Sequence, residues 1–261
     1  MTDKIDVSVE AVCAAYLDLA DRHAPGLVEG LYLQGSAALG DFTPGVSDVD
    51  FVAVIPEGAD VEPLREVHAR LKERGRSPHF DGLYVTWDDL RRDPEQTPAR
   101  PGVHAWRFEA ESRFERHLVT WHVLAQSGVT VRGPAVAEVG VHTDWDLLAR
   151  RTRENLAGYW TRWAEKSSRT TSLWGLAALV PARTSWGALG VTRLHHTLAA
   201  GEVTSKTAAG EYALRLFDER WHRIVREALR IRKGGAALYR NPFARRADLI
   251  AYMRMVLANV P

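Results

Sequence analysis

Hydrophobic positions in the first half of the chain change repeatedly between the helical and the strand period. Helical spacing predicts helices over residues 9–20, with Ser8 as the cap, and over residues 64–75. Short apolar runs predict strands over residues 30–33, 48–55, 79–86 and 129–131, the last as an edge strand. The proline-rich stretch 91–102 is expected to be a loop, and residues 113–125 a helix. This alternation is typical of an α/β (α+β) domain with a mixed sheet.

The second half of the chain is predicted to be helical almost to its end. Thr143-x-x-Asp146 reads as a variant of the capping box, and helical spacing follows it. Breaks come at Pro181, Gly201, Gly234–Gly235 and Pro242. We therefore expect a catalytic domain at 1–141 and an all-α helical bundle domain at 142–261.

Tryptophans are frequent in this helical half. A packed bundle core is the simpler interpretation, and stacking of a sugar ring or base in a cleft is the alternative. The residues concerned are Trp160, Trp163, Trp174, Trp186 and Trp221.

Composition narrows the class of protein. The chain has 261 residues and a formal net charge of +1, so no strong field favours nucleic acid, and no nucleic-acid partner is expected. The single cysteine, Cys13, lies on the apolar face of a predicted helix and is expected to pack there. The lack of a membrane-length apolar run and of a signal peptide leads us to expect a cytoplasmic protein. We also expect a monomer. The histidines form no metal-binding pattern in the sequence, and no nucleophile elbow is present.

The richest chemistry lies between residues 35 and 55. Gly35 and Ser36 follow a strand, where a free backbone and a hydroxyl can receive a phosphate. Asp48 and Asp50 enter the next strand at positions i and i+2, so their side chains are expected to project together. Two carboxylates so spaced can hold a pair of Mg²⁺ ions. An ordinary loop with two solvated aspartates is the simpler alternative.

This order of residues resembles the signature of the DNA polymerase β-type nucleotidyltransferase superfamily: Gly-Ser, a spacer, then Ser47-Asp48-x-Asp50. Within it, the chain is similar to the aminoglycoside adenylyltransferases that modify streptomycin and spectinomycin. The further segments that carry this likeness are 81–89, 128–134 and 201–209.

The resemblance implies roles for several residues. It makes Asp81 the third carboxylate, which accepts the proton of the attacking hydroxyl, although relatives carry Glu there. Asp88 and Glu109 are its substitutes. It also makes Lys206 and Arg193 ligands of the nucleotide phosphates. Lys206 follows the expected cap Ser205, and a cation in a first helical turn is unfavourable unless an anion binds there.

The activity implied is Mg²⁺-dependent transfer of AMP from ATP to a hydroxyl of a small molecule, releasing pyrophosphate. Gly35, Ser36 and Ser47 would orient the phosphates, and Trp106 matches loosely a tryptophan that contacts the drug. Residues 179–186 lack the acids with which relatives bind the cationic drug, and Arg183 stands there instead. Two alternatives stay open: a protein that binds ATP without turnover, and a nucleotidyltransferase acting on protein or RNA.

Overall fold

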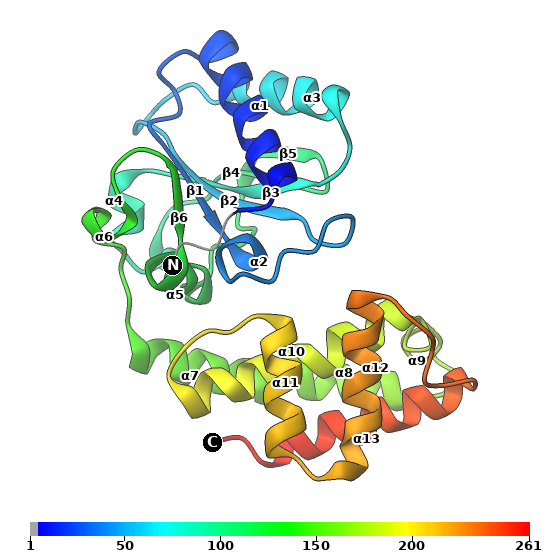
Figure 1. Cartoon of the computed structure of the whole chain (residues 1–261). Coiled ribbons are helices and arrows are strands. Elements are labelled where there is room, and N and C mark those ends of the chain that lie inside the picture. Colours follow the sequence, from blue (N-terminus) through cyan, green and yellow to red (C-terminus); the bar gives the residue numbers. More distant parts are fainter. Residues whose placement is uncertain (1–4) are drawn as a thin grey trace. The chain divides into compact units, whose positions relative to one another are not determined.

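The computed structural model describes residues 5–261, which divide into two compact units. The first ends at Asp144 and the second runs from Trp145 to Pro261, whereas the sequence placed the boundary after Val141. The first unit contains a mixed sheet with helices and the second is helical, so the predicted fold class is confirmed (Figure 1).

The sheet of the first unit has six strands in the order β5-β4-β3-β2-β1-β6. β2 and β3 are parallel, and the other neighbours are antiparallel. β6 lies at the edge, as predicted. The strands are β1 (Gly30–Gln34), β2 (Val49–Val54), β3 (Phe80–Val85), β4 (Arg100–His104), β5 (Arg107–Ser112) and β6 (Val129–Arg132).

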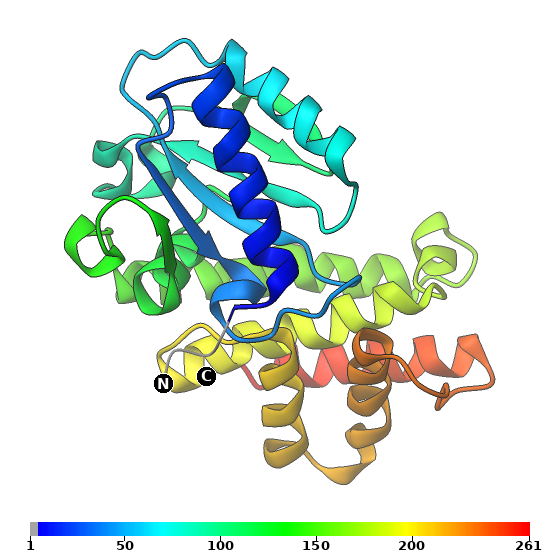
Figure 2. The same ribbon diagram turned by 45° about the horizontal axis from the view of Figure 1, so that its top comes forward.

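Two long helices, α1 (Val7–His23) and α3 (Glu62–Arg74), lie side by side over one face of this sheet (Figure 2). Their apolar residues pack on Val49, Phe51 and Ala53 of β2, and Cys13 is buried there as predicted. Burial raises the pKa of the Cys13 thiol to about 12, so this thiol stays protonated. Cys13 is therefore a packing residue.

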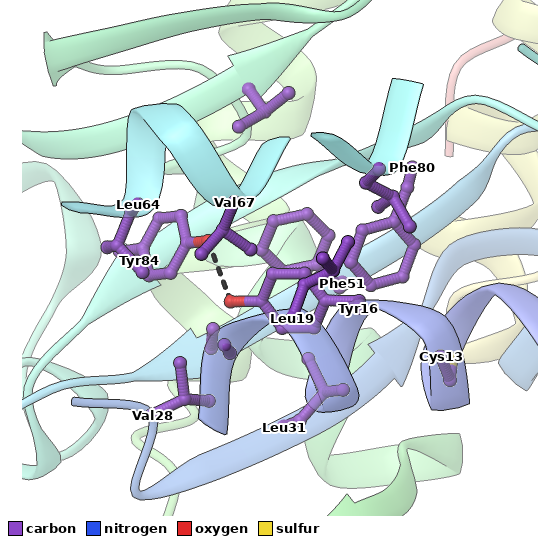
Figure 3. Packing of buried hydrophobic residues seen from close by; sticks show 14 of the residues in the cluster. Cys13, Tyr16, Leu19, Val28, Leu31, Phe51, Leu64, Val67, Phe80 and Tyr84 are labelled. Atoms are coloured by element: carbon purple, nitrogen blue, oxygen red, sulfur yellow. Dashed lines mark hydrogen bonds between the residues drawn. The ribbon is translucent and has the colours of Figure 1, made fainter. Parts of the chain in front are cut away.

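Within this core the Tyr16 and Tyr84 hydroxyls share a hydrogen bond of 2.7 Å (Figure 3). His68 Nε2 lies 2.6 Å from the Tyr84 hydroxyl. The three side chains are buried, and these hydrogen bonds offset the cost of burying the two hydroxyls and His68 Nε2. The core thus ties α1, α3 and β3 together.

The opposite face of the sheet is covered by α5 (Leu118–Ser127) and α6 (Val136–Val139). Trp121 of α5 is fully buried against Val52 and Leu83. Short helical turns complete the unit: α2 (Gly35–Ala38), α4 (Trp87–Leu90) and a 3-10 turn at Pro94–Gln96.

Several local predictions were wrong. Asp6, not Ser8, caps α1, because the Asp6 carboxylate accepts the Ser8 N–H. The predicted loop at 91–102 already enters β4 at Arg100, and the predicted helix at 113–125 begins only at Leu118. Thr143 is not a cap, because the next helix begins at Trp145.

The second unit is built from helices around one apolar core. Trp160 and Trp163 are buried in this core, which confirms the packing interpretation for them, whereas Trp174 is 43% exposed. The elements are α7 (Trp145–Asn155), a π-helical turn at Leu156–Trp160, α8 (Thr161–Ser168), α9 (Leu173–Ala177), α10 (Pro181–Ala200), α11 (Lys206–Leu216), a 3-10 turn at Glu219–Trp221, α12 (His222–Lys233) and α13 (Pro242–Ala258). Within the described residues, no helix combines the length and apolarity needed to cross a bilayer.

Candidate active site

The turn after β1 brings the backbone close to a carboxylate. Gly35 has a φ of +62°, which a residue with a side chain rarely adopts. A methyl group on residue 35 would also overlap Asp50 Oδ2. Glycine is therefore required here for both its conformation and its small size.

The loop from α2 to β2 is closed by hydrogen bonds from its own residues. Ser47 Oγ accepts the Thr43 N–H at 3.1 Å, and the Ser36 carbonyl accepts the Asp41 N–H at 2.9 Å. Ser36 lies inside α2 instead of capping it, since the cap position is Gln34 and no side chain bonds there. The two serines thus fix the loop between Gly35 and the aspartates.

Asp50 and Asp81 are direct partners on the parallel strands β2 and β3. Gly82 permits this pairing, because a methyl group there would overlap the Phe51 carbonyl oxygen. Asp81 therefore lies inside a strand and not in a turn, where Asp-Gly sequences are common. Asp48 is exposed one residue before β2 begins.

Asp81 is buried, with 2% of its surface exposed. Its Oδ2 accepts the Ala105 N–H at 2.9 Å and lies 3.2 Å from His104 Nδ1. Its Oδ1 is buried without a hydrogen-bond partner within residues 5–261. A buried carboxylate oxygen without a donor is costly, by about 1–3 kcal/mol or more. One oxygen is thus held by the protein and the other has no donor within the described residues.

The donors to Asp81 come from the β4–β5 turn, which the sequence analysis missed. Ala105 and Trp106 have φ values of 48° and 65°, between the paired residues His104 and Arg107. Two successive left-handed residues form the type I′ hairpin turn, which normally contains Asn or Gly. Such strain in side-chain-bearing residues is typical of functional sites, and here it aims the Ala105 N–H at Asp81.

His79 completes a group of three possible metal ligands. Its ligand atom and those of Asp48 and Asp81 all lie within 4.8 Å of one another, in the only such group among the residues described. His79 Nδ1 is 3.5 Å from Asp48 Oδ1. The sequence analysis assigned no histidine to a metal pattern, and the structure adds His79 to the candidate ligands. Its signal was present in the sequence: it lies two residues before Asp81, as Asp48 does before Asp50.

Trp106 contacts this group from the side. Its ring lies edge-on to His79, with centroids 5.7 Å apart and planes at 75°, and its Nε1 donates to the Arg76 carbonyl at 3.2 Å. The predicted substrate residue is thus a neighbour of the imidazole. It is half-buried and so keeps an accessible edge.

The predicted substitutes for Asp81 are placed differently. Asp88 follows the far end of β3 and pairs with Arg92 at 2.7 Å. Glu109 is exposed on the edge strand β5. Asp89, beside Asp88, is buried as the capping-box acid of α4 and is bound by Arg100 at 2.5 Å.

The second unit positions Arg193 and Lys206 close to one helix start. Ser205 caps α11 by accepting the Ala208 N–H, as predicted, and Lys206 is the first residue of that helix. Arg193 of α10 donates from Nε to the Thr204 carbonyl at 3.0 Å. Arg193 therefore fixes the residue that leads into α11.

The start of α10 has no acidic residue in its first turn. Val180 is the cap, and Arg183 is exposed on the helix. Burial raises the pKa of Tyr159, and the positive charge of Arg183 opposes this shift. In the folded protein, as in the sequence, the start of α10 thus carries the positive charge of Arg183 and no acid.

Two known domain families match the chain, and one of them covers the candidate active site. Residues 17–100, which hold β1, β2, β3 and the three aspartates, match the nucleotidyltransferase domain family. Residues 172–257 match the aminoglycoside adenylyltransferase C-terminal domain. The chain is therefore a nucleotidyltransferase. It carries the C-terminal domain of the aminoglycoside adenylyltransferases as its second unit.

A solved structure shares the fold. It is a spectinomycin adenyltransferase AAD(9) from Enterococcus faecialis, crystallised with ATP and spectinomycin. The likeness has a TM-score of 0.66 at 12% sequence identity, and covers 94% of this chain and 99% of the other. None of the curated proteins matches the chain.

Proposed function

We propose that this protein transfers AMP from ATP to a hydroxyl of a small molecule and releases pyrophosphate. The observation that carries the proposal is the pairing of Asp50 with Asp81 across β2 and β3, beside the Gly35 turn. The family matches add the class of enzyme, and the similar adenyltransferase was crystallised with ATP.

Asp48 and Asp50 would hold Mg²⁺, for which carboxylate oxygens are suitable ligands. The donor set fits such an ion, since the exposed Asp48 lies close to Asp81, a carboxylate with one unpartnered oxygen within the described residues. Two bound ions would neutralise charge on the triphosphate as the reaction proceeds.

The protein's own groups would position the acceptor hydroxyl and take its proton. The acceptor oxygen attacks the α-phosphorus, and the bond from that phosphorus to the pyrophosphate oxygen breaks. Asp81 takes the hydroxyl proton at Oδ1, because Oδ2 already accepts the Ala105 N–H. The turn of Ala105 and Trp106 holds this carboxylate in place.

Gly35, Ser36 and Ser47 would hold the β- and γ-phosphates at the closed loop. Lys206 and Arg193 would contribute positive charge from the second unit. The first turn of α11 combines the positive end of the helix dipole with the Lys206 ammonium, which favours an anion.

The acceptor would differ from a polycationic drug in its charge. The α10 start offers Arg183 and no acid in its first turn, so it favours a neutral or anionic acceptor there. Streptomycin is accordingly expected to be a poorer acceptor than less basic hydroxyl compounds.

The test is pyrophosphate release from ATP with a panel of acceptors, including spectinomycin, streptomycin and neutral aminocyclitols. Mg²⁺-dependent, acceptor-dependent release is expected, and Asp48→Ala or Asp50→Ala should abolish it. Turnover that persists in either variant would remove the assigned metal ligands. ATP binding without release across the panel would instead indicate a binding protein.

A further inference from the structure

The group formed by Asp48, His79 and Asp81 includes a nitrogen ligand, which the aspartate pair does not explain. We propose that these three residues form a divalent-cation site in the nucleotide-free protein, with His79 as a ligand, and that the site favours Mn²⁺ and related transition ions over Mg²⁺. The proposal deepens the proposed function. It rests on that function for the assignment of Asp48 as a metal ligand.

The first support is the buried Asp81 Oδ1, which lacks a donor within the described part of the chain. Because Asp81 is only 2% exposed, water cannot readily compensate it. Its other oxygen is fixed by Ala105, so the carboxylate cannot turn to satisfy Oδ1 without losing that bond. A cation bound at Oδ1 would provide the partner that this buried oxygen lacks.

The second support is the way in which the imidazole is held. The His79 carbonyl accepts the Val49 N–H at 2.8 Å, which fixes its backbone at the start of β2. Trp106 packs edge-on against the ring, and Arg76 anchors Trp106 through its carbonyl. His79 Nδ1 thus stays within 3.5 Å of Asp48 Oδ1. These contacts limit the motion of the imidazole beside Asp48.

The preference among metals follows from the donor atoms. Mg²⁺ binds almost only oxygen, whereas imidazole suits Mn²⁺, Co²⁺ and Zn²⁺ increasingly well. Ligands at about 2.1 Å from an octahedral ion lie roughly 3–4 Å apart. The separations of up to 4.8 Å require only small side-chain rotations to reach this geometry. The site concerns the resting protein, before the acceptor whose proton Asp81 takes has bound.

The test uses the full chain with Mn²⁺ alone and no nucleotide. Electron paramagnetic resonance of free Mn²⁺ gives the dissociation constant, and electron spin-echo modulation detects a ¹⁴N nucleus coupled to bound Mn²⁺. Wild type should show the coupling. His79→Gln should lose it and bind Mn²⁺ about tenfold more weakly. His79→Asp should keep Mn²⁺ binding without the coupling.

His104→Gln is the matched control, because His104 contacts the other oxygen of Asp81 and is outside the group of three ligands. It should retain the ¹⁴N coupling. Absence of coupling in wild type, persistence of coupling in His79→Gln, or no Mn²⁺ binding at millimolar metal would each overturn the proposal. Mg²⁺-dependent turnover, lost in Asp50→Ala, would then still support the proposed function on its own.

Discussion

The Asp50 carboxylate occupies the space that a side chain on residue 35 would fill, because Gly35 and Asp50 face each other across the β1–β2 connection. The glycine turn and the acidic strand are therefore one structural unit. A side chain added at residue 35 must displace the Asp50 carboxylate.

Gly35→Ala is expected to lower kcat/KM about a hundredfold, because misplacing a catalytic group by about 1 Å has such an effect. The control is Gly40→Ala. Gly40 has a similar φ of +66°, but a methyl group there meets nothing within 4 Å. Both variants should lose about 1–2 kcal/mol of stability from backbone strain. Equal activities of the two variants, measured alongside urea unfolding, would contradict the role of the Gly35–Asp50 contact.

Asp81→Asn should lower kcat by about 10²–10⁴-fold, because the amide keeps the shape of the side chain but cannot take a proton. Steady-state kinetics with the best acceptor measures this. Asp88→Asn and Glu109→Gln serve as controls, since both acids are exposed and lie away from Asp81. A larger loss in either control would move the proton acceptor away from Asp81.

Lys206→Gln should raise the KM for ATP about tenfold while leaving the fold intact. Removing a cation from the first turn of α11 should also stabilise the protein slightly, by about 0.3–1 kcal/mol. Lys233→Gln is the control, because Lys233 is exposed in the last turn of α12. An unchanged KM for ATP in Lys206→Gln would exclude the phosphate-binding role.

The protein should lose stability in mild acid partly through His68. Burial lowers the pKa of His68 to about 3, from about 6.5 in the unfolded chain. Below pH 6.5 the unfolded chain binds a proton that the folded protein does not, so stability falls as pH falls. At pH 5 this one group lowers the free energy of unfolding by about 2 kcal/mol.

His68→Gln tests this dependence, since glutamine can still bond to the Tyr84 hydroxyl. The free energy of unfolding in urea, measured at pH 7.5 and pH 5, should fall less in His68→Gln than in wild type. His23→Gln, at the end of α1, should keep the wild-type difference. Identical pH dependence in all three proteins would contradict the buried neutral state of His68.

The part of the site that lies in one continuous segment could be predicted from the sequence. Gly35, Asp48 and Asp50 sit within a single strand–loop–strand, and the glycine and the apolar run predict its turn and its second strand. That the Asp48 and Asp50 side chains project together stays a prediction. The cap Ser205 and the core role of Cys13 follow from similarly local rules.

The rest depends on tertiary pairing. His79 reaches Asp48 only because β2 and β3 are parallel with Val49 opposite Phe80, a register that periodicity does not specify. The β4–β5 hairpin was missed because its turn uses Ala105 and Trp106, which carry none of the usual turn signals. Pro101 lies within β4, and because proline is uncommon inside strands this segment was predicted to be a loop.

Transfer of the label from [α-³²P]ATP to a purified acceptor, confirmed by the mass of an added AMP group, tests the central claim most directly. Wild type and Asp41→Asn, a change of an acid in the same loop, should both form the adenylylated product with Mg²⁺. Asp50→Asn should form none. Equal product from Asp50→Asn and Asp41→Asn would contradict the account.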